Sequence, residues 1–160
     1  MLFARALLSF ALLPGLVAGV IPPWLASADR MKGARWMPGY FVLGCGLCLL
    51  VWCVRDFYVS GRGTLAPWDP PRHLVIVGLY RFTRNPMYLG VLTVVAGWAL
   101  AESSPVLWRY LLFLAVAFHL RVMLFEEPWL ERQFGPQWSA YSAGVRRWWP
   151  RVSPWRFPSA

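Results

Sequence analysis

Charged residues are scarce in this chain of 160 residues, at 14% of the total. A typical soluble domain has roughly 25%. Hydrophobic residues make up 58%, and the mean hydropathy is +0.46. The length suffices for one domain, and a soluble domain of this size could not bury so much apolar surface. The composition therefore argues against a soluble protein and favours a membrane protein.

Charge is also missing from long continuous stretches. Two stretches carry none and a third carries only one acid and one base: 6–28, 36–54 and 85–120. A helix needs about 20 apolar residues to cross the hydrocarbon core. We therefore predict an all-α, polytopic integral membrane protein with about four transmembrane helices in a single domain, 1–160. A signal peptide is the alternative for the first stretch, whose length favours a helix.

Proline and glycine divide the chain into four parts. Two N-terminal transmembrane helices are expected within 1–59, at about 2–25 and 38–59, and the glycines of the second would permit close helix contact (Gly39, Gly44 and Gly46). A polar connection at 60–85 contains too much glycine and proline for a continuous helix. A helical hairpin follows at 86–127, with helices at about 86–101 and 105–127. An interfacial segment at 128–160 is expected to begin at Pro128 and to break at Gly135-Pro136 and Gly144.

Acidic residues are few, with 7 against 16 basic residues and a formal net charge of +9. In a soluble protein that balance would suggest nucleic acid, but no zinc-finger or helix-turn-helix pattern supports it. The basic residues lie just outside the apolar stretches, as in cytoplasmic loops, where they would attract anionic lipids. We expect membrane lipids and no nucleic acid as partners, with the connection and C-terminal segment facing the cytoplasm of a bacterial inner membrane. The first loop departs from this rule with Arg30, Lys32 and Arg35.

Cysteine is limited to three residues, whereas tryptophan is frequent at 11. Cys45 and Cys48 form a CxxC pattern inside an apolar stretch without a second pair. We expect such thiols to behave as small hydrophobes and predict no metal site. Five tryptophans follow the last apolar stretch, which predicts a segment lying at the membrane surface: Trp129, Trp138, Trp148, Trp149 and Trp155.

Two polar clusters flank the predicted hairpin, one within 72–88 and the other at Arg121 and Glu126-Glu127. The expected topology places both at the cytoplasmic end, where they can meet. Ionisable residues near the bilayer usually face a protein cavity and mark functional sites. The alternative is that the two glutamates only mark where the helix leaves the lipid. His119 is expected to pack or to bond a neighbouring helix.

The order of these clusters carries a family resemblance. The first is Gly78-Leu79-Tyr80-(x3)-Arg84-Asn85-Pro86-Met87-Tyr88-Leu89-Gly90, and the second is Glu126-Glu127-(x2)-Leu130-(x3)-Phe134-Gly135-(x5)-Tyr141-(x3)-Val145-Arg146-(x3)-Pro150. Together they resemble the isoprenylcysteine carboxyl methyltransferase family and the related membrane phospholipid methyltransferases. The resemblance covers roughly 72–150 and leaves out the first two helices.

The resemblance implies an S-adenosyl-L-methionine site and methyl transfer to a lipophilic or amphipathic acceptor. Glu126 would face the cofactor and Arg121 would orient the acceptor, and these are the catalytic candidates. Eukaryotic members of the family have histidine where this chain has Asn85. The implied cofactor-binding set is Arg72, His73, Leu74, Val75, Tyr80, Asn85, Pro86, Met87, Tyr88 and Glu126.

The chemistry is compatible with those residue types. The cofactor carries a sulfonium and an ammonium, which a partly buried carboxylate can hold. In-line methyl transfer gains mainly from alignment and from exclusion of water. A prenylated cysteine carboxylate, a phospholipid amine and a small thiol all stay open as acceptors, and the sequence does not indicate an oligomeric state. A non-catalytic membrane protein and an NADPH-dependent reductase relative are the competing hypotheses.

Overall fold

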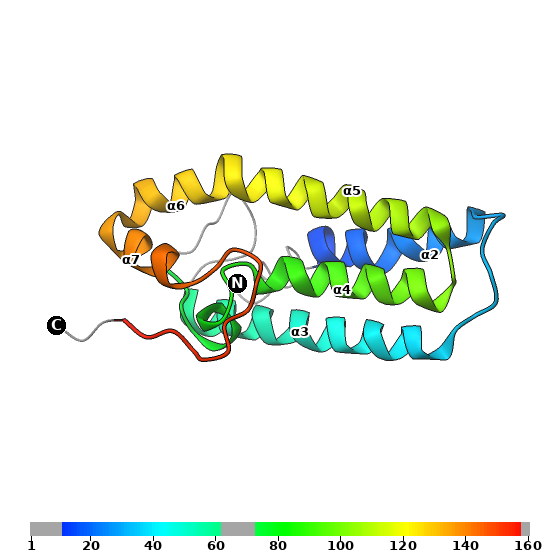
Figure 1. Ribbon diagram of the computed structural model, residues 1–160, viewed down its shortest axis with the longest axis horizontal. Coiled ribbons are helices and arrows are strands. Elements are labelled where there is room, and N and C mark those ends of the chain that lie inside the picture. Colours follow the sequence, from blue (N-terminus) through cyan, green and yellow to red (C-terminus); the bar gives the residue numbers. More distant parts are fainter. Residues whose placement is uncertain (1–10, 62–72, 158–160) are drawn as a thin grey trace.

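The computed structural model describes residues 11–61 and 73–157 and contains only helices and irregular segments there. The elements follow one another as η1 (Ala11–Val20), α2 (Ile21–Ala28), α3 (Met37–Gly61), η2 (Gly78–Arg81), α4 (Pro86–Ala101), α5 (Pro105–Arg121), η3 (Val122–Glu126), α6 (Glu127–Phe134) and α7 (Pro136–Gly144). The long helices run side by side, with α6 and α7 at one end and the α2–α3 connection at the other (Figure 1). The predicted all-α class is confirmed for the described residues.

Within residues 11–61 and 73–157, two helical stretches are long and apolar enough to cross a bilayer. They are Met37–Asp56 and Pro105–Phe134, with mean hydropathies of 1.9 and 1.6. Only 22% and 17% of their most apolar windows are buried within the protein, so they are not ordinary core helices. The apolar stretches Pro14–Ala28 and Pro86–Ala101 are shorter. At about 1.5 Å per residue, the 16 residues of α4 span roughly 24 Å, less than the hydrocarbon core.

Helix α4 occupies the centre of the bundle, with α3 along one side and α2 and α5 on others. Glycine permits the closest of these contacts. A Cβ atom added to Gly97 would lie 2.4 Å from the backbone nitrogen of Leu43, and one on Gly46 would lie 2.6 Å from that of Val94. The prediction of close contact is confirmed for Gly39 and Gly46, whereas Gly44 has no atom within 4 Å of its added Cβ and was wrongly included.

Most predicted boundaries are confirmed, because proline and local caps define them. Pro86 and Pro105 begin α4 and α5, and the Ser104 hydroxyl accepts a hydrogen bond from the Leu107 backbone N–H at 3.3 Å. Gly135, at φ +49°, separates α6 from α7, and Gly144 ends α7. The first predicted helix begins outside the described residues and reaches Ala28 rather than residue 25.

The predicted end of the hairpin at residue 127 coincides with the start of α6, but the chain changes its helical pitch there and does not leave the helix. The helix continues through Pro128 to Phe134 by way of the π turn η3. In this turn the Glu127 backbone N–H donates to the Val122 carbonyl, five residues back. Proline at 128 has no N–H to continue an α-helical pattern, and the wider turn leads into a new helix with proline in its first turn.

The C-terminal segment folds back onto the polar connection. Backbone N–H groups of Arg151 and Trp155 each donate at 2.9 Å to the carbonyls of Phe82 and Arg81. Trp138 and Trp155 are buried with Tyr141, while Trp149 is 75% exposed. The expectation that all five late tryptophans lie at the membrane surface is therefore wrong for Trp138 and Trp155, which form a protein core.

The contact between α3 and α4 yields the first prediction. Gly97→Ala should lower the free energy of unfolding by about 1–3 kcal/mol, because the new methyl meets backbone atoms that can move only with the helix. Thermal unfolding in detergent measures the effect. The matched control is Gly44→Ala, which enters open space and should leave stability nearly unchanged. Equal unfolding temperatures for the two variants would contradict the packing described.

Candidate active site

The first polar group of the site joins α4 to the end of α5. The Tyr88 hydroxyl donates a hydrogen bond to Glu126, and the Arg121 Nε lies 2.8 Å from Glu126 Oε1 and 3.1 Å from the Tyr88 oxygen. Phe118 packs on the Tyr88 ring at a centroid distance of 4.6 Å, with Trp148 on another side. Three of the residues predicted for the site are thus in direct contact.

The π turn makes this contact possible. In an α-helix, residues five apart point in directions about 140° different. Arg121 and Glu126 are five apart, and Val122–Glu126 is the π turn between them. A π turn closes after about one more residue than an α turn, so the two side chains come to the same side. The carboxylate and the guanidinium therefore form an ion pair within one helix.

Glu127 forms a second and separate polar group. Its carboxylate receives two hydrogen bonds from Arg147, at 2.6 and 2.8 Å, and Arg84 Nη1 lies 3.1 Å from Oε1. Burial lowers the pKa of Arg84, while the Glu127 carboxylate opposes that change. The hydrogen bonds from Arg147 to Glu127 raise the pKa of Arg147. Arg84 also lies over the ring of Trp138, 5.5 Å from its centroid.

The remaining predicted residues fall into two groups. Asn85 donates a hydrogen bond to the Arg147 carbonyl at 3.1 Å rather than capping α4, and Pro86 starts that helix. Leu74 packs against the Trp138–Tyr141 core, and Val75 and the α4 residue Met87 pack with Tyr80. His73 is exposed. Arg72 lies outside the described residues.

Tyr80, in the short helix η2, is buried. Burial raises the pKa of its phenol well above its usual value, and charges on Cys53, Tyr141, Asp56 and Glu126 raise it further. The Tyr141 hydroxyl donates to the Tyr80 carbonyl at 2.6 Å. Asp56 of α3 lies beside Gly78, which belongs to the same short helix η2 as Tyr80.

Asp56 is the functional candidate that the sequence did not indicate. The residue is 4% exposed, and its buried Oδ2 has no hydrogen-bond partner among the described residues. Arg55 reaches only Oδ1, at 3.3 Å. Gly78, at φ +50°, lies so close that any Cβ there would overlap Oδ2. A buried carboxylate oxygen without a donor is costly and indicates a place for a cationic group. The signal was weak, because Arg55-Asp56 follows an ordinary apolar stretch.

Two further residues were not predicted in their observed roles. Arg147 follows the quoted motif residue Arg146 but is the one that pairs with Glu127. Trp148 donates an indole hydrogen bond to His119 Nδ1 at 3.1 Å. His119 therefore bonds the C-terminal segment, not a neighbouring helix as one alternative expected.

The fold and the site together define a helical membrane protein with a polar site at one end of its bundle. The phospholipid methyltransferase family model matches residues 34–137, about two thirds of the chain. The chain belongs to the phospholipid methyltransferase family and is a membrane methyltransferase of that kind. No curated protein and no solved structure matches the chain significantly.

The family match corrects the extent of the resemblance. It begins before α3, so the second predicted transmembrane helix belongs to the family region although no similarity was expected there. It ends at residue 137, before the C-terminal residues Arg147 and Trp148 that complete the observed site.

The Glu127 group yields the second prediction. Glu127→Gln should lower the free energy of unfolding by about 1–3 kcal/mol, because it removes the shared carboxylate of two partly buried guanidinium groups. Chemical or thermal unfolding of the detergent-purified protein measures it. Glu131→Gln, on an exposed position of the same helix, is the matched control and should be nearly neutral. Unchanged stability of Glu127→Gln would show that the pairs contribute nothing to holding the tail.

Proposed function

We propose that the protein transfers a methyl group from S-adenosyl-L-methionine to a lipophilic or amphipathic acceptor that carries an anionic group. The observation that carries the proposal is the contact of Tyr88, Arg121 and Glu126 at the end of the bundle where family residues of the connection meet the C-terminal segment. Membership of the family supports methyl transfer.

The residues present fit this cofactor. It brings two positive centres, and the site offers two carboxylates, Glu126 and Asp56, of which Asp56 has a buried oxygen without a donor among the described residues. Glu126 is partly exposed, at 30% of its side chain, and can face a bound molecule. Asp56 and Glu126 would hold the cationic groups, and Tyr80 and Tyr88 would shape the space between them. The cofactor supplies the electrophilic methyl group.

The chain's own groups would contribute alignment and water exclusion. Arg121 is tied to Glu126 and Tyr88 through Nε, so its guanidinium is oriented while its side chain stays 50% exposed. An oriented guanidinium suits a phosphate or carboxylate on the acceptor. Positioning both partners against one another can lower the barrier substantially without a covalent intermediate. The partly buried rings of Phe118 and Trp148, which pack around Tyr88, would limit access of water.

A phospholipid amine is the acceptor that agrees best with both the oriented Arg121 and the family of the chain. Its phosphate suits Arg121, and its class agrees with the family description. An isoprenylcysteine carboxylate or a small thiol would differ in where the anion lies relative to the nucleophile. The acceptor would enter from the bilayer, between helices that span it several times.

The distribution of arginine supports a cytoplasmic site in a bacterial inner membrane. The site end carries most of the basic residues that the structure describes, among them Arg81, Arg84, Arg121, Arg132, Arg146, Arg147, Arg151 and Arg156. Two basic residues of the opposite loop, Lys32 and Arg35, pair with buried Glu102. Their charge is partly offset, so the loop departs less from the positive-inside rule than its sequence suggested.

The third prediction concerns the cofactor. Detergent-purified protein should bind S-adenosyl-L-methionine and S-adenosylhomocysteine saturably in calorimetry, and Glu126→Gln should weaken binding about 10–100-fold, because a charged contact is lost. Glu131→Gln should bind normally. Binding of NADPH alone would favour the reductase hypothesis, and no binding by folded protein would favour a non-catalytic one.

The fourth prediction concerns the acceptor. Transfer of labelled methyl should be tested with a phospholipid amine, a farnesylated cysteine and a small thiol. Arg121→Gln should lower kcat/KM at least 10-fold for the anionic acceptor that is used, since an oriented charge contact is lost. Arg132→Gln, an exposed arginine at the same end, should leave it unchanged. Equal rates for wild type and Arg121→Gln would remove Arg121 from acceptor binding.

A further inference from the structure

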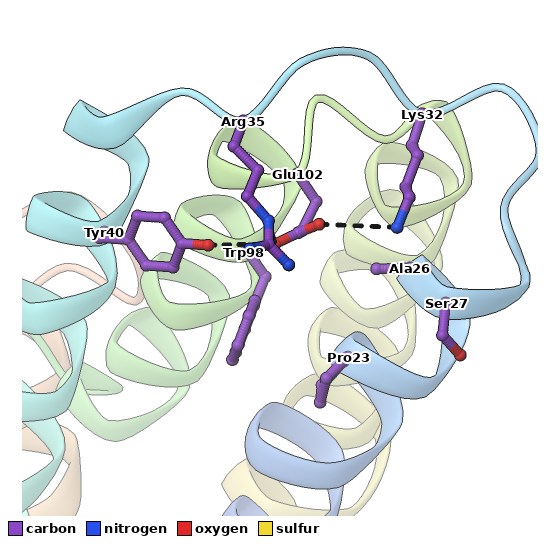
Figure 2. A pocket seen from close by; sticks show the side chains of 8 residues that line it. All are labelled: Pro23, Ala26, Ser27, Lys32, Arg35, Tyr40, Trp98 and Glu102. Carbon is purple, nitrogen blue, oxygen red and sulfur yellow. Dashed lines mark hydrogen bonds and ion pairs between the residues drawn. The ribbon is translucent and has the colours of Figure 1, made fainter.

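A pocket of about 300 Å³ lies at the end of the bundle opposite the candidate active site. Figure 2 shows α2 and α3 on its two sides and α4 between them. Pro23 and Ala26 of α2 and the Trp98 ring of α4 supply apolar walls, and Tyr40 of α3 faces them. The volume is at the lower end of small-molecule pockets.

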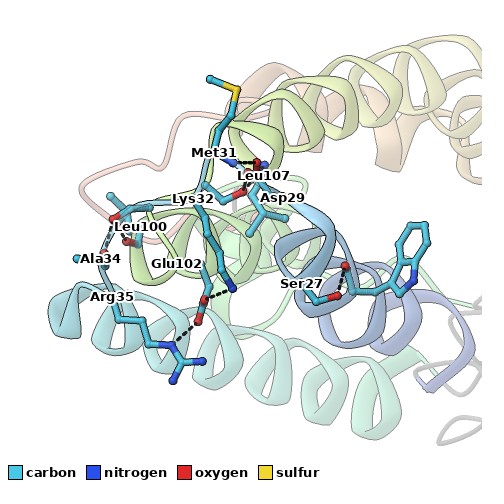
Figure 3. Close-up of polar contacts among 12 residues, drawn as sticks. Ser27, Asp29, Met31, Lys32, Ala34, Arg35, Leu100, Glu102 and Leu107 are labelled. Atoms are coloured by element: carbon cyan, nitrogen blue, oxygen red, sulfur yellow. Dashed lines mark hydrogen bonds and ion pairs between the residues drawn. The ribbon is translucent and has the colours of Figure 1, made fainter.

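The mouth of this pocket is polar and carries a net positive charge. Glu102, whose side chain is 7% exposed, accepts a hydrogen bond from the Tyr40 hydroxyl at 3.1 Å. Arg35 Nε lies 3.3 Å from Glu102 Oε1, and Lys32 Nζ lies 3.9 Å from Oε2. One carboxylate thus faces two cations whose side chains are 41% and 72% exposed. Figure 3 shows both cations reaching Glu102 from the loop.

The loop that carries these cations is anchored on both sides. Asp29 accepts hydrogen bonds from the Ser104 hydroxyl and, at 3.3 Å, from the Val106 backbone N–H. The Gly33 N–H donates to the Ser103 carbonyl at 3.1 Å. The loop is therefore held over the α4–α5 turn, and the positions of its cations are built into the fold.

The depth of the pocket in the membrane follows from the helix ends. At this end of the bundle two apolar stretches end, at Ala28 and Ala101, and two begin, at Met37 and Pro105. The polar mouth lies just beyond them and the apolar walls just inside. Trp24 and Trp36, 66% and 49% exposed, flank the same boundary, where indoles settle. The pocket is therefore polar toward the membrane surface and apolar toward the bilayer interior, as a phospholipid is.

We infer that this pocket binds the headgroup of an anionic phospholipid in the leaflet opposite the active site. The lipid phosphate would contact Lys32 and Arg35, and its glycerol region would lie against Pro23, Ala26 and Trp98. Charge favours this occupant, because the pocket has one more cation than anion and Glu102 already has Tyr40 and Arg35 as partners. A zwitterionic headgroup would bring an ammonium for which the described residues lining the mouth offer no second carboxylate. This lipid is distinct from the methyl acceptor.

The experiment uses the full-length protein, delipidated in detergent. Short-chain phosphatidylglycerol should raise the unfolding temperature saturably, by more than phosphatidylcholine of the same chain length, and inorganic phosphate should have no effect. Lys32→Gln should weaken the apparent affinity about fivefold, as expected for loss of one basic residue at an anionic lipid. Arg30→Gln, an exposed arginine of the same loop that does not line the pocket, should bind as wild type does.

A second variant covers the possibility that removing a cation disturbs the fold. Ser27→Phe leaves all three charged residues in place and adds bulk at the pocket wall, so it should reduce the lipid effect while circular dichroism stays unchanged. Equal stabilisation by phosphatidylglycerol and phosphatidylcholine, or full stabilisation of both variants, would overturn the proposal. A comparable effect of inorganic phosphate would overturn its lipid source.

Discussion

The carboxylate of Glu127 connects the parts of the site end that are distant in sequence. Arg84 comes from the connection before α4, Arg147 from the segment after α7, and Glu127 from the first turn of α6. The carboxylate and the two guanidinium groups are partly buried, and charge-assisted hydrogen bonds contribute more there than at an exposed surface. The backbone bond from Arg84 to the Arg146 carbonyl and the bond from Asn85 to the Arg147 carbonyl lie alongside. Without this group the C-terminal segment would lose its ion pairs to the connection and would be held there by these hydrogen bonds and by its tryptophan core.

The adjacent residues Glu126 and Glu127 have different partners because a π turn follows Arg121. The π turn directs Glu126 toward Arg121 and Tyr88, and the first residue after it, Glu127, points to the tail. A regular α-helix would place Arg121 and Glu126 on different faces. Because of the π turn, the two adjacent carboxylates point to different partners. Glu127 holds the C-terminal segment, and Glu126 is the one proposed to face the cofactor.

The sequence predicted the helices where its signals were local. Pro86, Pro105 and Gly135 act through their own backbone geometry, so the ends of α4, the start of α5 and the end of α6 could be inferred. The π turn was not predicted, because proline at 128 normally indicates a new start and the compensation by a wider turn depends on the surrounding fold.

The site was predicted in part for the same reason. Tyr88, Arg121 and Glu126 stand in recognisable motifs, and the fold brings them together. Asp56 and Arg147 stand in no motif that marks them, and only the tertiary structure places one beside Gly78 and the other beside Glu127. Likewise, nothing in the sequence separates buried Trp138 from exposed Trp149, since both are aromatic residues of one basic segment.

The two ends of the bundle use charge in opposite ways. At the site end, acids and bases from several segments neutralise one another within the protein, which permits burial of Arg84 at 14% exposure and Glu127 at 17%. At the opposite end, one buried glutamate faces two cations that stay largely in contact with solvent. Unbalanced charge at a membrane boundary attracts counter-charge from the lipid surface. The cations that weaken the positive-inside pattern in the sequence are thereby the groups that we propose to hold lipid, and the Glu102 carboxylate positions both of them.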